Sequence, residues 1–99
     1  MTVIPADQCS DMAQVRAAID ALDAEIVTLL GKRMRYIEAA ARIKAERNEV
    51  RDEARKAEVI ANARKVAATA GFPDGLTAAL YEMLVEGSIA HEYEAFDRR

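Results

Sequence analysis

Apolar residues recur at steps of three and four along the first half of the chain, which is the period of one face of an α-helix. Ser10 or Asp11 can cap the start of this helix, and only Gly31 interrupts it before about Glu46 or Asn48. We therefore expect one helix of about 36 residues. Its apolar stripe consists of Met12, Val15, Ile19, Leu22, Ile26, Leu29, Leu30, Met34, Ile37 and Ala41.

Two shorter helices follow with the same period. Asp52 is expected to cap a helix from Glu53 to Ala70, and Gly71 suits the position after its last residue. Asp74 is expected to cap a third helix, from Gly75 to about Phe96. The pattern thus predicts one long and two shorter helices.

The remaining segments lack helical periodicity. Residues 1–9, which contain Pro5, are expected to form an extended arm, and the polar residues 47–51 a short loop. With 4 Gly, 2 Pro and 5% aromatic residues, the composition favours helix over sheet. We predict an all-α chain that forms a single helical domain over residues 1–99.

The length of the first helix has a consequence for assembly. At ~1.5 Å per residue it would be roughly 54 Å long, whereas a compact chain of this size has a radius of gyration of about 13 Å. The two shorter helices can cover only part of its apolar stripe. A second copy of the chain is therefore expected to cover the rest, which predicts a homodimer.

The net charge of −3 and the pI near 5.2 argue against a protein that coats nucleic acid or an anionic membrane. Cys9 is the only cysteine, which excludes a disulfide within the chain and a site of several cysteines for a metal. No stretch of the sequence approaches the ~18 to 20 consecutive apolar residues that a membrane span requires. We expect a cytoplasmic protein without a metal site or a cofactor.

Basic charge is nevertheless concentrated in mid-chain, where eleven of the fourteen Lys and Arg residues lie between Lys32 and Lys65. Within this region Arg33 and Lys44 fall near the apolar stripe, about 20° apart in direction and roughly 16 Å apart along the helix. Two long side chains at that spacing can share one small dianion. Arg16 lies about 25 Å before Arg33, so it can join this site only from the other chain of an antiparallel dimer.

These residues carry a family resemblance, which extends from Cys9 to Phe96. An arginine, a second arginine seventeen residues later, a lysine eleven further on and a V-R-D-x-x-R loop stand in the order typical of the all-α chorismate mutases. The chain resembles most the branch that includes isochorismate pyruvate lyase, because of Cys9 and the compact loop from Lys44 to Arg55. The matching segments are Val15–Asp23, Leu29–Met34, Ala40–Lys44 and Val50–Arg55.

The resemblance implies an intertwined homodimer with two buried sites, each of which binds a dicarboxylate cyclohexadiene. Arg16 from the partner chain would hold the enolpyruvyl carboxylate together with Lys44. Arg33 would hold the ring carboxylate with help from Ser88, and Arg55 would cover the substrate.

Further contacts are implied at both ends of the substrate. The backbone near Asp52 would meet the ring hydroxyl, and Glu92 would lie near the ether oxygen. Two residues depart from the common family pattern: Lys56 stands where many members have Glu, and Glu92 where many have Gln.

The rearrangement of chorismate to prephenate needs no nucleophile, only a held conformer and stabilised charge on the breaking ether oxygen. Lys44 and Glu92 are the candidates for that oxygen, and with Arg55 they form the predicted catalytic set. Ser88 and Glu92 are four residues apart, so they share one helix face. Glu92 donates a hydrogen bond only when protonated; burial favours that form and neighbouring cations oppose it.

Three functions remain open at this stage. Chorismate mutase is preferred, because it is the commoner activity and because Glu92 occurs in mutases. An isochorismate pyruvate lyase, which releases salicylate and pyruvate, could use the same pocket. A non-catalytic helical dimerisation module is the third interpretation, and Lys56 is the residue that favours it. Nucleic-acid binding ranks last, since no aromatic residues interleave the basic ones.

Overall fold

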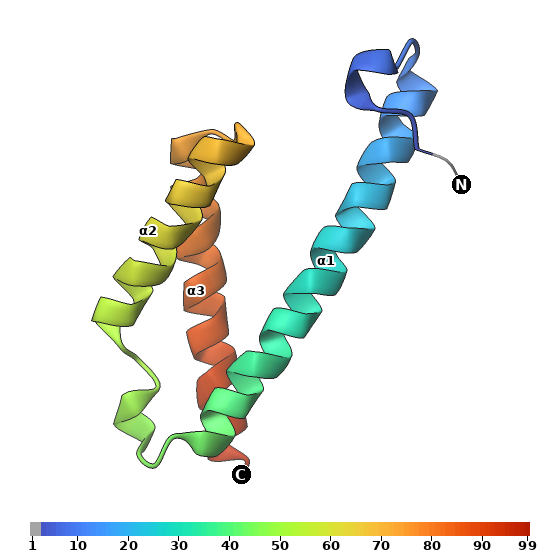
Figure 1. Cartoon of the computed structure of the whole chain (residues 1–99). Helices are drawn as coiled ribbons and strands as arrows, with labels where there is room; N and C mark the ends of the chain where they lie inside the picture. The colour runs from blue at the N-terminus through green and yellow to red at the C-terminus, as the bar shows by residue number, and fades with distance from the viewer. Residues whose placement is uncertain (1–2) are drawn as a thin grey trace. The chain divides into compact units, whose positions relative to one another are not determined.

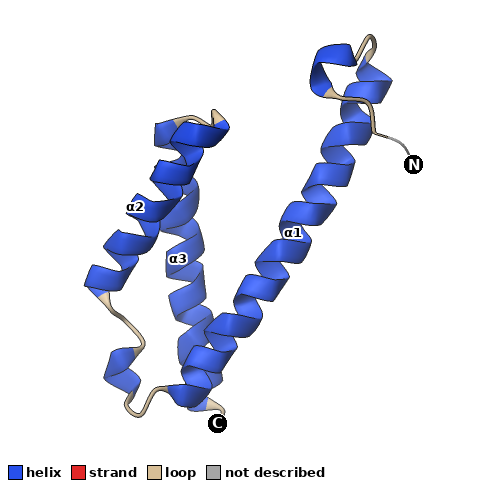
Figure 2. Cartoon of the chain, in the orientation of Figure 1, coloured by secondary structure: helices blue, strands red, loops and turns tan. Residues whose placement is uncertain are grey.

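The computed structural model describes residues 3–99, and this part of the chain is helical without a strand (Figures 1 and 2). The predicted arrangement of one long and two shorter helices is confirmed. The chain divides after Arg35 into two compact units, and the expectation of a single domain over residues 1–99 stays a prediction. The elements are η1 (Ala6–Gln8), α1 (Met12–Ile43), η2 (Arg47–Glu49), α2 (Glu53–Ala70) and α3 (Asp74–Asp97).

Asp11 caps the start of α1, because its Oδ1 accepts a hydrogen bond from the Gln14 backbone amide at 2.9 Å. The Gln14 side chain in turn accepts from the Ser10 amide at 2.7 Å. The preceding residues are not a fully extended arm as expected, since residues 6–8 form a 3-10 turn. Met1 and Thr2 of that arm lie outside the described residues.

The apolar stripe of α1 lies largely open to solvent in the single chain. Ile19, Leu22, Ile26 and Leu29 are each half or more exposed. Such a row of aliphatic side chains on one helix face is typical of a surface that a partner covers. The helix of 32 residues is roughly 48 Å long.

The predicted end of α1 near Glu46 or Asn48 is wrong, because the helix ends at Ile43. The backbone amide of Glu46, which would continue the helical ladder, instead donates to the Glu49 carboxylate at 2.7 Å. The carbonyl of Ala41 accepts from the Arg99 guanidinium at 3.1 Å. The Glu49 carboxylate and the Arg99 guanidinium therefore take the place of the next helical partners.

Capping residues set most of the other helix ends. The Asp52 carboxylate accepts from the Arg55 amide at 3.0 Å, and Gly71 adopts the left-handed conformation at φ 75°, so both predictions are confirmed. The predicted cap by Asp74 is wrong. Asp74 is the first residue of α3, and its carboxylate instead accepts two bonds of 2.8 Å from Arg64.

Helices α2 and α3 pack side by side and antiparallel within residues 36–99 (Figure 1). The core between them is built on Val50, Val85 and Ile89, each less than a tenth exposed. Partly buried side chains extend this core, namely Val59, Ile60, Tyr93 and Phe96. Three polar residues of α3 are buried as well: Thr77, Ser88 and Glu92.

Candidate active site

The structure brings together two of the three residues predicted to be catalytic. Lys44 follows the last residue of α1, and its Nζ lies 2.7 Å from Glu92 Oε2 on α3. The Glu92 side chain is only 6% exposed and that of Lys44 28%, so this ion pair lies mostly away from water. The ammonium also lies 3.5 Å from the carbonyl oxygen of Val50. The site therefore contains a cation held by a buried anion.

Ser88 stands one turn before Glu92 on α3, and both are 4% exposed. Their common burial fits the prediction that the two residues share one helix face. The Ser88 hydroxyl donates to the carbonyl of Leu84 at 2.7 Å. Serine within a helix often makes this bond, and it fixes the direction of the hydroxyl oxygen.

Asp52 and Arg55 lie at the exposed start of α2. The Asp52 carboxylate is used as the helix cap, and the backbone carbonyl of Asp52 accepts from the Lys56 amide at 2.9 Å. The Arg55 guanidinium donates to Glu58 one turn further along the helix, and its side chain is 62% exposed. At such an exposed position, the Arg55 guanidinium can leave Glu58 and bind another anion.

Lys56, one of the two departures from the family pattern, belongs to an ion-pair cluster between α2 and α3. Its Nζ lies 2.7 Å from Glu82 and 2.8 Å from Glu86. Arg51 binds Glu86 at 2.8 Å and Glu53 at 2.9 Å. Hydrogen bonds from Arg51 first and Lys56 second lower the pKa of Glu86 to about 2. Lys56 thus joins two helices.

The sequence analysis missed a further pair that links α1 to α3. His91 Nε2 lies 2.7 Å from Glu38 Oε2, and both side chains are partly exposed. These residues are 53 positions apart in the chain. No local pattern could have predicted their contact, because helix periodicity relates only neighbours within a few turns.

Arg16 and Arg33 belong to the unit that ends at Arg35. Arg16 is exposed on α1, and Arg33 is partly buried. Whether these arginines join Lys44 and Glu92 around one ligand stays a prediction.

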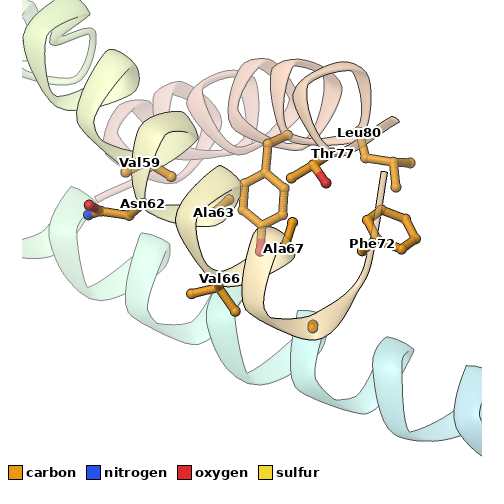
Figure 3. Close-up of a pocket in the computed structure, with 10 residues that line it drawn as sticks. Val59, Asn62, Ala63, Val66, Ala67, Phe72, Thr77 and Leu80 are labelled. Atoms are coloured by element: carbon orange, nitrogen blue, oxygen red, sulfur yellow. The ribbon is translucent and has the colours of Figure 1, made fainter. Parts of the chain in front are cut away.

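A pocket of about 450 Å³ lies between α2 and α3. Figure 3 shows its lining, which comes from α2, the turn after it and the first turns of α3. The lining is mainly apolar and includes Val59, Ala63, Val66 and Leu80. None of the residues predicted to bind substrate lines it, so its chemistry suits an apolar group rather than a dianion.

Among residues 3–99, no group of three or more His, Cys, Asp or Glu side chains could hold a metal ion. Over the same residues, no helix has the length and hydrophobicity required to span a membrane.

Comparisons with known proteins agree with the resemblance inferred from the sequence. Residues 15–93 match the family model of chorismate mutase type II. The chain is also 30% identical over 86 residues to an isochorismate pyruvate lyase of Pseudomonas aeruginosa, which covers 87% of this chain and 85% of that protein. The matched segment contains every residue of the predicted site, from Arg16 to Glu92. The family prediction, including the lyase branch, is confirmed.

Proposed function

Because this chain belongs to the chorismate mutase type II family, we propose that it converts chorismate to prephenate. The observation that carries the proposal is the buried contact between Lys44 and Glu92. The same site could release pyruvate from isochorismate, and the similarity to an isochorismate pyruvate lyase favours that second candidate. Both reactions break the ether bond to the enolpyruvyl group, so both place charge on the same oxygen.

Lys44 is suited to stabilise that charge. An ammonium group has three N–H donors; Glu92 accepts one, and the Val50 carbonyl lies at the limit of bonding distance for another. A third donor is left for a substrate oxygen. A donor that is already oriented before the charge develops lowers the barrier without further reorganisation. Glu92, as an ionised acceptor, supplies that orientation.

The remaining substrate contacts follow the assignments made from the sequence. Arg33 and Ser88 hold the ring carboxylate, Lys44 and the partner chain's arginine at position 16 hold the enolpyruvyl carboxylate, and Arg55 covers the substrate. The exposed stripe of α1 supports the homodimer that this arrangement requires. A bound dianion would then lie among several cations and be fixed in one conformer.

The two activities are separated by giving the purified protein chorismate and isochorismate in parallel. Formation of prephenate from chorismate supports the mutase, and fluorescent salicylate from isochorismate supports the lyase. Lys44→Ala should abolish either activity, whereas Lys65→Ala, which removes an exposed cation of α2, should not. If neither substrate is converted and neither raises the melting temperature, the chain is a helical dimerisation module instead.

A second variant tests the dianion site. Arg33→Ala should leave the helical fold largely intact and abolish binding of the dicarboxylate, measured by calorimetry. If the variant unfolds instead, Arg33 has mainly a structural role. Sedimentation of the parent protein over a range of concentrations tests the dimer, and a monomer at micromolar concentration would contradict it.

A further inference from the structure

The guanidinium of Arg99 binds the backbone where α1 ends. It donates to carbonyl oxygens of four residues in the last turn of the helix and just after it: Ala41 at 3.1 Å, Arg42 at 3.5 Å, Lys44, and Ala45 at 3.1 Å. The guanidinium carbon lies 3.6 Å from the centre of the Phe96 ring. The Arg99 guanidinium therefore stacks on an aromatic ring while it binds the backbone on both sides of Lys44.

These contacts lie where the helix stops. The last carbonyls of an α-helix lack partners within the helix, and an arginine near its end can supply donors to them. If α1 continued, the carbonyl of Ala41 would accept from the amide of Ala45. Arg99 occupies that carbonyl. The amide of Lys44 still donates to Ala40 at 2.9 Å, so Lys44 is the last residue whose amide keeps a helical bond.

A second contact holds the chain three residues beyond Lys44. Arg47 makes two hydrogen bonds to Asp97, at 2.9 and 3.2 Å, and lies over the Tyr93 ring at 4.4 Å. Glu92, the anion that meets Lys44, precedes Tyr93 on the same helix. The last turns of α3 therefore hold both the lysine backbone and its partner carboxylate.

We propose that Arg99 is a positioning residue for Lys44: its bonds to the end of α1 place the lysine backbone so that the ammonium meets Glu92. The part of the inference that concerns catalysis rests on the proposed function. The part that concerns the backbone does not, because it depends only on contacts within residues 36–99. In this proposal Arg99 does not contact the substrate and acts only through Lys44.

The test compares Arg99→Ala and Arg99→Lys with Arg98→Ala, which removes the exposed neighbouring arginine. Hydrogen exchange of the amides of residues 44–50 is measured in the full chain. Arg99→Ala should exchange roughly 10-fold faster or more, since several charge-assisted bonds are lost. Arg99→Lys keeps the charge but not the planar fork, so it should fall between Arg99→Ala and the parent. Arg98→Ala should match the parent.

Turnover supplies a readout that a purely structural role would not change. Well below the melting temperature, Arg99→Ala should lower kcat by roughly 10-fold with little change in KM, because a misplaced Lys44 loses interaction with the transition state. Arg99→Lys should recover part of this loss. If Arg99→Ala does not fold, Arg99→Lys carries both measurements, and values equal to those of Arg98→Ala overturn the proposal.

The outcomes separate this inference from the proposed function. A parent protein that converts neither chorismate nor isochorismate refutes the proposed function, and hydrogen exchange at residues 44–50 then decides the positioning role alone. A parent that turns over substrate while Arg99→Ala keeps its full kcat and slow exchange refutes the positioning role and leaves the proposed function intact.

Discussion

Replacing Glu92 with Gln tests the buried ion pair most directly. The amide has nearly the same shape as the carboxylate, so the substitution removes charge with little change in packing. Its partner Lys44 then keeps a hydrogen-bond acceptor but loses the anion that lies 2.7 Å away. Any change in stability or turnover can therefore be assigned to the electrostatic part of the contact.

The expected magnitude follows from burial. A hydrogen bond to a charged group contributes about 1.5–3 kcal/mol and a neutral one about 0.5–1.5 kcal/mol, so the substitution should cost about 1–2 kcal/mol. Since the Lys44 side chain is 28% exposed, water can still solvate it, and the larger loss of a fully buried pair is not expected. For a domain of this size the melting temperature should fall by about 4–15 °C.

The assay is thermal unfolding followed by circular dichroism at pH 7 and one fixed protein concentration, because the stability of an oligomer depends on concentration. Glu94→Gln is the matched control, since Glu94 is exposed on the same helix. Its free energy of unfolding should stay within about 0.5 kcal/mol of that of the parent. If Glu92→Gln melts with the control, the ion pair does not stabilise the fold.

The pH dependence of turnover tests whether Glu92 donates a hydrogen bond in the reaction. If Glu92 donates to the ether oxygen, as the sequence also allowed, turnover rises on acidification. Glu92→Gln should flatten that dependence, and a parent profile that is flat from pH 5 to 8 would contradict the donor role.

Three further predictions concern the fold that carries the site. Val50→Ala, at a core position only 3% exposed, should lower the free energy of unfolding in urea by about 1.5–3 kcal/mol; an unchanged midpoint would show that this core is not tightly packed. Asp52→Ala should lower stability by about 1 kcal/mol whereas Asp52→Asn should not, because only an oxygen at this position accepts from the Arg55 amide; equal losses would refute the cap. The pKa of Glu86 lies at about 2 instead of 4.5, chiefly because of Arg51, so its stabilising effect is complete above about pH 4.5 and is lost as pH falls through 2. The melting temperature of Glu86→Gln should therefore vary less with pH between 4.5 and 2 than that of the parent, and parallel curves would contradict the cluster.

Local signals in the sequence were sufficient for most of the secondary structure. The periodic apolar stripe predicted the long helix, and Asp52 and Gly71 marked the ends of α2 correctly. These signals work because a capping side chain acts on amides within one turn of itself. The prediction that Asp74 caps α3 failed because a residue outside that turn competes for its carboxylate. Its carboxylate pairs with Arg64 on the preceding helix, and this competition depends on how α2 and α3 pack.

The candidate site shows the same division. Residue order and spacing were enough to select Lys44 and to indicate the family, and the family resemblance then implied Glu92. Neither could show that the two side chains touch. The sequence also could not predict the ion pairs of Lys56 or the contact between His91 and Glu38, because each involves a partner on another helix.

By itself, then, the sequence determined that the chain is helical, where most helices begin and end, and which charged residues could serve an anion. Only the tertiary structure decided that α1 stops at Ile43 and that Lys44 meets Glu92. Glu92 and Arg99 are returned to the end of α1 from about 50 residues away, where Glu92 meets Lys44 and Arg99 adds to the local contact between Glu46 and Glu49. Helix periodicity and capping are interactions within a turn or two, whereas these contacts exist only after α3 has folded back onto the chain.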